Sequence, residues 1–419
     1  MNVLAPRQGT AQGRSQGGAL PWAEPTGRDA LRRALRRERR VHWAAHPLAY
    51  PLALVLRRLG PVLRVPGIGH VVNDPAIARA VLTDNDGFTK NGPGSAGELI
   101  TQVMGDYALL NLEGDAHREL HALLVAALNA SAVHDLVQEV WGAGLDEAVS
   151  TLRAGRRVDL ARLAAVLTGR TMGRLLGIGR LDDDGAALAA YQLGETMVSV
   201  VRLRSGRLSP RVVARSRQRF LALTHDMAAG LASAPAGSII GRLRVAGFNE
   251  AQVRGVGAAL LLTGTGTVAT ALPRTVALIS DAGLWEQVGD RSARLAAIDE
   301  CLRVITPSPV MLRSVRRDTV VAHHRFQEGR RVAILTYAAV RAFEDGDSLR
   351  LDRDVPASVR GLYFGAGRHH CIGYALARAE LDLAVERLRS VGPLRVSRRA
   401  AAFCVLIPRY RVLEVEKVP

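Results

Sequence analysis

The sequence predicts a mainly α-helical protein with small β sheets. Hydrophobic residues make up 48% of the 419 residues, which is enough for a large buried core. Aromatic residues are scarce, at 4%, and the apolar content is mostly Ala, Leu and Val, which favours helix over sheet. Apolar residues also recur at helical spacing over most of the chain between 75 and 308.

The N-terminal part predicts a leader, a helix and a hairpin, in that order. Residues 1–28 are rich in Gly, Gln, Pro and Ala without periodicity, so we expect a disordered leader. A basic helix is expected from Asp29, and two β-rich runs separated by Pro-Gly predict a hairpin over 62–74. Because we find no repeats and no linker, we expect a single domain over 29–419.

The C-terminal part predicts strands on either side of a helix. Alternating polar and apolar residues predict short strands over 311–337. Apolar residues at helical spacing predict a helix just after Cys371. The tail over 402–416 is interpreted as a β hairpin around Pro408.

The net charge of +17 does not indicate nucleic-acid binding. Basic residues are spread along the whole chain, lysine occurs only at positions 90 and 417, and aromatic side chains for base stacking are missing. A basic face that docks an acidic protein fits this distribution better. The N-terminus has no signal-peptide core and no membrane span, and the cysteines form no disulfide or zinc pattern, so we expect a cytoplasmic protein.

The segment FGAGRHHCIG, residues 364–373, places Cys371 after a glycine-rich loop and before the predicted helix. Unpaired N–H groups and the helix dipole at such a position stabilise a thiolate. Gly365 and Gly367 let the backbone turn sharply and approach a flat ligand, and Gly373 does the same one turn later. Arg368 and His369 add groups that bind carboxylates. These are the requirements of a haem with a thiolate ligand and two propionates.

This segment resembles the haem loop of the cytochrome P450 family, F-x-x-G-x-[HR]-x-C-x-G. Phe364, Gly367, His369, Cys371 and Gly373 match it. The resemblance implies that Cys371 ligates the iron of haem b (iron protoporphyrin IX), which would lie between a long central helix and this loop. It covers roughly residues 45–419 of the chain and implies the P450 fold.

Further residues match the family in the same order along the chain. Glu300 and Arg303 match its E-x-x-R helix motif, and Arg353 matches the third member of that ion-pair network. Arg313 stands where the family places a propionate-binding arginine. In the family's H-x-x-x-R pattern His117 matches, but His121 replaces the arginine, and the neighbouring Arg118 is a candidate substitute.

The apolar run 255–278 resembles the family's central helix, which carries [AG]-G-x-[DE]-T. Thr267 matches the threonine that assists oxygen activation, but Gly266 stands in place of the acid. Thr263, Thr267 and Thr270 share one helix face and could form a hydroxyl and water chain that replaces the acid. Alternatively, these threonines only donate hydrogen bonds back to helix carbonyls.

The resemblance implies a monomeric monooxygenase that hydroxylates or epoxidises a medium-sized organic, natural-product substrate, using O2 and electrons from a ferredoxin. The expected pocket wall comprises residues 88–110, 190–212, 263–267 and 308–312. Because Gly266 replaces the acid, one alternative is peroxide-driven, dehydrogenation, coupling or nitrogen-oxide chemistry. A second alternative is a P450-like domain that recruits partners without catalysis, although such domains typically lose the haem cysteine.

Overall fold

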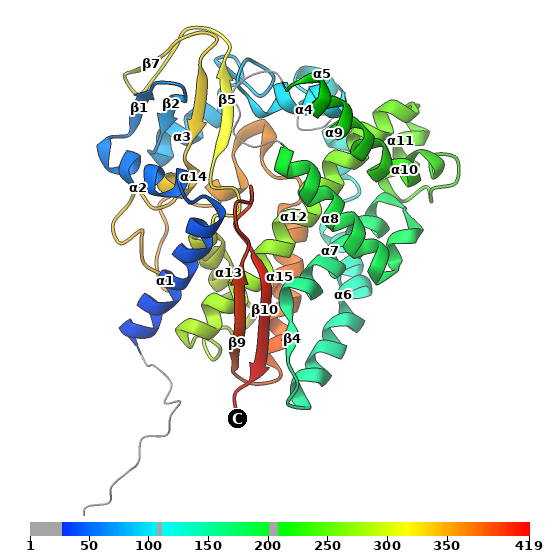
Figure 1. Cartoon of the computed structure of the whole chain (residues 1–419), viewed down its shortest axis with the longest axis vertical. Helices are drawn as coiled ribbons and strands as arrows, with labels where there is room; N and C mark the ends of the chain where they lie inside the picture. Colours follow the sequence, from blue (N-terminus) through cyan, green and yellow to red (C-terminus); the bar gives the residue numbers. More distant parts are fainter. Residues whose placement is uncertain (1–26, 106, 108–110, 201–207) are drawn as a thin grey trace, which may run out of the picture.

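The computed structural model describes residues 27–105, 107, 111–200 and 208–419 (Figure 1). Helices dominate, as the composition predicts. They are α1 Arg28–Ala45, α2 Ala49–Leu59, α3 Pro75–Thr83, α4 Ala96–Met104, α5 Gly114–Val125, α6 Ala130–Arg153, α7 Leu160–Leu176, α8 Asp184–Val200, α9 Pro210–Leu223, α10 His225–Ala229, α11 Ile239–Val245, α12 Glu250–Ala282, α13 Arg291–Ile305, α14 Thr336–Ala339 and α15 Tyr374–Arg389. The expected leader over 1–28 lies outside the described residues except for its last two, and α1 begins at Arg28.

The long central helix is α12, which Figure 1 shows between the sheet-containing side and helices α6 to α11. It starts at a capping box, in which Asn249 Oδ1 accepts from Gln252 N (3.1 Å) and Gln252 Oε1 accepts from Asn249 N (2.8 Å). By length and composition α12 could cross a membrane, as could the bent pair α5 and α6 taken as one span. However, 78% of the apolar window of α12 is buried inside the protein, so it packs as a core helix.

The largest sheet contains the predicted hairpin. Its strand order is β1 (Val62–Val65), β2 (Gly69–Val72), β8 (Arg331–Ile334), β5 (Met311–Val315) and β3 (Phe88–Thr89). β1 pairs antiparallel with β2, while β2 pairs parallel with β8 through Val71 and Ala333. A separate hairpin joins β6 (Thr319–Val321) to β7 (His324–Phe326). The strands expected over 311–337 are therefore confirmed as β5 to β8.

The C-terminal hairpin is real, but its predicted first strand is wrong. β9 is Leu394–Ala401 and pairs antiparallel with β10, Tyr410–Lys417; β10 also pairs with β4, Val158–Asp159. Residues 402–409 form the connecting loop instead of a strand, and Cys404 takes a positive φ of 52°. The loop backbone bonds elsewhere: Cys404 N donates to Ala44 O (3.0 Å), and Pro408 O accepts from Arg274 Nη1 of α12 (2.8 Å). Of the apolar residues of this loop, Ile407 lies beside Gly266 of α12, whereas Phe403 is exposed to solvent.

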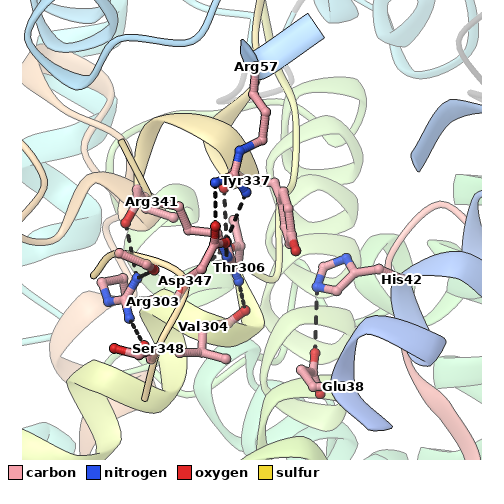
Figure 2. A network of polar contacts seen from close by, with 12 residues as sticks. Glu38, His42, Arg57, Arg303, Val304, Thr306, Tyr337, Arg341, Asp347 and Ser348 are labelled. Atoms are coloured by element: carbon pink, nitrogen blue, oxygen red, sulfur yellow. Dashed lines mark hydrogen bonds and ion pairs between the residues drawn. The ribbon is translucent and has the colours of Figure 1, made fainter. Parts of the chain in front are cut away.

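Buried arginines tie α13 to the segment that follows the sheet (Figure 2). Arg341 donates to the carbonyls of Tyr337 (2.9 Å) and Val304 and to the hydroxyl of Thr306 (3.1 Å). Its guanidinium also lies 3.7 Å from the centre of the Tyr337 ring. Each hydrogen bond satisfies a group that burial would otherwise leave unpaired.

The predicted E-x-x-R network is present in α13. Arg303 Nε and Nη2 donate to the two carboxylate oxygens of Glu300 at 2.7 and 2.8 Å. Arg353 lies 3.4 Å from the same carboxylate, and Arg303 also donates to Ser348 O at 2.7 Å (Figure 2). The network fixes the segment over 346–353 on α13.

Candidate haem-binding site

The loop that carries Cys371 is held by a hydrogen bond within its own backbone. Short 3-10 helices at Leu362–Phe364 and Gly367–His369 shape it, and Cys371 N donates to Phe364 O at 2.9 Å. Gly365 and Gly367 have φ values of 79° and 67°, which side chains rarely adopt. A Cβ on Gly367 would lie 2.9 Å from Leu82 O, so this position has no room for one. Glycine is therefore needed at both positions because of the positive φ, and at Gly367 also because the Leu82 carbonyl leaves no space for a side chain.

The Cys371 side chain is solvent-accessible, unlike that of Cys301, which is buried. Burial among the surrounding groups nevertheless raises the pKa of the Cys371 thiol, while the Gly373 N–H and the charge of Lys90 lower it. The helix predicted just after Cys371 is present as α15, which begins at Tyr374, and the thiolate stays a prediction. In the protein alone, desolvation outweighs the N–H group and the cation.

A cluster of basic side chains lies beside this loop. The rings of His117 on α5 and His369 lie 4.4 Å apart, and His121 lies 5.4 Å from His117. Burial and neighbouring cations lower the pKa of His117 to about 4 and that of His369 to about 2. Buried Nδ1 of His117 has no hydrogen-bond partner among the described residues. Such an orphan atom indicates a missing polar ligand.

Arg313 and Lys90 belong to the same cluster. Arg313 is buried on β5, and its Nη1 donates only to the adjacent Leu312 carbonyl (2.9 Å) among the hydrogen bonds of the described residues. Burial lowers the pKa of Arg313 to about 10. Burial and the charge of Arg313 lower the pKa of Lys90 to about 7, although Glu113 and Cys371 oppose this. Both cations thus lie where the protein alone does not neutralise them.

Lys90 is the residue that the sequence reasoning missed. Its one available signal was rarity, because the chain has only two lysines and the other, Lys417, is exposed near the C-terminus. Glu113, the acid beside Lys90, accepts instead from Thr89 Oγ1 (2.6 Å) and Lys90 N (2.9 Å) and pairs with Arg316. Arg118, the expected substitute for the arginine missing at His121, pairs with Asp115 and its side chain is 66% exposed. Lys90 thus lies beside the two histidines, whereas Arg118 pairs with Asp115 at the surface, and a haem contact of Arg118 stays a prediction.

The central helix contributes an accessible patch in an otherwise buried stretch. Thr263 is exposed and Thr267 partly exposed, whereas Thr270 is buried, so Thr270 does not share their open face. Thr263 Oγ1 donates to Ala259 O (2.7 Å), Thr267 Oγ1 to Thr263 O (2.9 Å) and Thr270 Oγ1 to Thr267 O (2.8 Å). The backward hydrogen bonds are thus present, and a hydroxyl and water chain through the free lone pairs of these threonines stays a prediction.

The donor set fits a haem. No group of three or more His, Cys, Asp or Glu that could hold a bare metal ion occurs in the part of the chain that the structure describes. One accessible thiol would suit an iron whose remaining ligands come largely from a porphyrin, and the unpaired histidine and the cations would suit propionates. Phe364 packs beside the loop, with its ring 4.9 Å from that of Tyr374.

The fold is that of solved cytochrome P450 structures. A P450 EryK mutant in complex with erythromycin B superposes with a TM-score of 0.72 at 22% identity, covering 91% of this chain and 97% of that one. Epothilone B-bound cytochrome P450epoK gives a TM-score of 0.74 at 19% identity, covering 90% of this chain and 98% of that one. At these identities the likeness establishes the fold class, a mainly helical protein with small sheets around a long central helix.

Sequence comparisons add the family. Residues 294–388 match the family model "Cytochrome P450". Cytochrome P450-SU2 of Streptomyces griseolus is 28% identical over 298 residues, which cover 69% of this chain and 70% of that protein. Cytochrome P450 119 of Sulfolobus acidocaldarius is 25% identical over 184 residues, 43% of this chain and 45% of its own length. The matched segment thus spans less than half of that relative. Residues 294–388 therefore carry the cytochrome P450 signature, and over 69% of its length the chain is similar to a protein of that family.

Proposed function

We propose that the protein is a haem-thiolate monooxygenase with Cys371 as the iron ligand. The observation that carries this proposal is the accessible Cys371 thiol beside a buried cluster of unneutralised basic groups. His117, His369, Lys90 and Arg313 would hold the propionates. When bound, the haem supplies the reductive activation of O2 for insertion of one oxygen atom into a C–H or C=C bond.

The proposed stoichiometry consumes one O2, two electrons and two protons, and yields the oxygenated substrate and one water. The open face of α12 at Thr263 and Thr267 would border the reacting atoms. Of the predicted pocket wall, residues 106, 108–110 and 201–207 lie outside the described residues. Among the described side chains of the remaining segments, the charged groups include Lys90, Glu98 and Glu195, and we expect the substrate to contact mainly apolar side chains and threonines.

For the substrate we propose a medium-sized natural product. Support comes from two solved P450 structures, which hold erythromycin B and epothilone B, and from a relative in Streptomyces fradiae named 20-oxo-5-O-mycaminosyltylactone 23-monooxygenase. For the electron donor we propose an acidic ferredoxin, because Arg118 and Arg368, which neighbour His117 and His369 in the sequence, are exposed. A monomeric, cytoplasmic enzyme carrying haem b remains our prediction.

The test is the CO difference spectrum of the dithionite-reduced protein. Thiolate-ligated haem gives a characteristic long-wavelength Soret band, which we expect for the parent protein and for the control Cys404→Ala. Cys371→Ala should lose that band while keeping the far-UV circular dichroism of the folded protein. An unchanged band in Cys371→Ala would overturn the assignment. Turnover with peroxide alone, but not with O2 and a ferredoxin, would instead favour peroxide-driven chemistry, the alternative suggested by Gly266 in place of the acid.

A further inference from the structure

Three of the four glycines in the first half of α12 differ in what surrounds the position of a side chain. A Cβ on Gly257 would lie 2.5 Å from Met227 Sδ, and one on Gly264 would lie 2.4 Å from Met172 Sδ, so a side chain there requires the methionine to move. A Cβ on Gly266 would meet nothing closer than 3.4 Å. Its nearest neighbour is not a packing group but Oε1 of Glu195, a residue of α8.

The Glu195 carboxylate is held at this position by an ion pair. Its Oε2 contacts Nη1 of Arg409, and the two side chains are only 13% and 19% exposed. Arg409 ends the loop over 402–409, which also brings Ile407 Cδ1 to 3.7 Å from the Cβ position of Gly266. Ala402 N donates to Arg409 O (2.9 Å), so the loop that carries this arginine is tied to the C-terminal hairpin. One carboxylate oxygen is therefore anchored while the other is turned toward α12.

Gly266 lies beside the accessible face of the helix. At 100° per residue, Gly266 is displaced from Thr263 by about 60° and from Thr267 by about 100° around the helix axis. The Glu195 carboxylate thus lies at the edge of the patch formed by Thr263 and Thr267. Its partner Arg409 belongs to the C-terminal part of the chain.

We propose that Glu195, reaching across from α8, supplies beside Gly266 the proton-relaying carboxylate that α12 lacks. The proposal rests on the monooxygenase function proposed above. The carboxyl group would give its proton to water at the Thr263 and Thr267 face, and the resulting carboxylate would pair with Arg409 until it takes up a proton from solvent. Two such cycles supply the two protons consumed per O2, with the two electrons coming from the redox protein. Glu195 would therefore act through water, to which it passes protons, and would not contact the substrate.

The experiment compares Glu195→Gln with the double variant Glu195→Gln/Gly266→Asp, which returns a carboxylate from the other helix. Glu139→Gln is the control, since Glu139 forms a similar pair with Arg174 (2.9 Å) at the surface. Substrate-free O2 consumption is driven by NADPH, a ferredoxin and its reductase, in H2O and in D2O. We expect Glu195→Gln to slow it by about 100-fold with a changed solvent isotope effect, and the double variant to recover at least part of the rate.

Two readouts separate this role from a structural one. The first electron transfer, followed as CO-complex formation, needs no proton and should be equal in all variants. The infrared stretching frequency of the bound CO should shift in Glu195→Gln, because a charge near the ligand is lost, and should return toward the parent value in the double variant. Equal O2 consumption and isotope effects in Glu195→Gln and parent would overturn the proposal.

A third variant covers the case in which Glu195→Gln does not fold. Arg409→Gln removes the cation that favours the carboxylate, so the pH profile of O2 consumption should move upward by about one unit. An unmoved profile would also overturn the proposal. If the parent protein itself lacks the thiolate CO band, the proposed function has failed before any variant is compared, so the two failures are distinguishable.

Discussion

The rings of His117 and His369 meet edge to face with centroids 4.4 Å apart, one from α5 and one from the Cys371 loop. Lys90, Arg313 and Arg368 each lower the pKa of His369 through their charges. The protein thus assembles basic groups at one place without a matching set of acids, since Glu113 is engaged by Thr89, the Lys90 backbone and Arg316. Such an arrangement costs folding free energy unless an anion occupies it.

Lys90→Met should stabilise the haem-free protein while weakening its hold on haem. Because the pKa of Lys90 falls to about 7 on folding, the unfolded chain binds an extra proton between that pH and the ordinary lysine pKa. The stability of the parent therefore rises with pH across this window. The gain from Lys90→Met, on the order of 1 kcal/mol, should be full at pH 7 and below and vanish above the ordinary pKa.

Urea unfolding of haem-free protein at pH 6, 7 and 10 measures this gain, and haem transfer to a scavenger protein measures retention. Lys417→Met, at the other lysine of the chain, is the matched control and should change neither quantity. Equal haem transfer from Lys90→Met and parent would show that Lys90 does not contact the cofactor.

Arg303→Leu should destabilise the protein by about 3–5 kcal/mol, because it strands the buried Glu300 carboxylate. Arg350→Ala is the contrasting surface change. Arg350 bonds Asp352 at 3.1 Å in solvent, so its loss should cost less than about 1 kcal/mol. Thermal and urea unfolding of both variants gives the comparison, and similar losses for the two would contradict this account of the network.

Gly264→Ala and Gly142→Ala should have opposite signs. The new methyl group on α12 would lie 2.4 Å from Met172 Sδ, whereas on α6 nothing lies within 4 Å of it. Gly142→Ala should therefore stabilise by about 1 kcal/mol through helix propensity. Gly264→Ala should destabilise by roughly 1–3 kcal/mol, and adding Met172→Ala should relieve the clash. Unfolding midpoints test both, and a neutral Gly264→Ala would mean that Met172 moves aside freely.

Glu380→Gln should flatten the pH dependence of stability. Burial in α15 raises the pKa of Glu380 to about 8, against hydrogen bonding with Thr171 and Trp141. Because the folded protein then holds a proton that the unfolded chain has released, stability falls as pH rises from about 4.5 to about 8. The amide removes this loss, which approaches about 1.4 kcal/mol per pH unit. Urea unfolding at pH 5 and pH 8 should show a smaller difference for Glu380→Gln than for the parent; equal differences would contradict the buried-acid assignment.

The sequence by itself determined what depends on neighbours along the chain. The turns at Gly365 and Gly367, the helix after Cys371, the i and i+3 pair of Glu300 and Arg303 and the hairpin over 62–74 all follow from local spacing, and the structure has them. Local backbone preferences and side-chain periodicity depend only on residues close together in the sequence, so the sequence predicts them.

Only the tertiary structure decided which distant residues face the site. It brought Lys90 rather than Arg118 to the histidines, turned residues 402–409 from a strand into a loop against α12, and set Glu195 beside Gly266. These contacts join helices and strands far apart in sequence, where burial, helix crossing and the competition for hydrogen-bond partners choose the neighbours. A short pattern in the sequence does not contain that information.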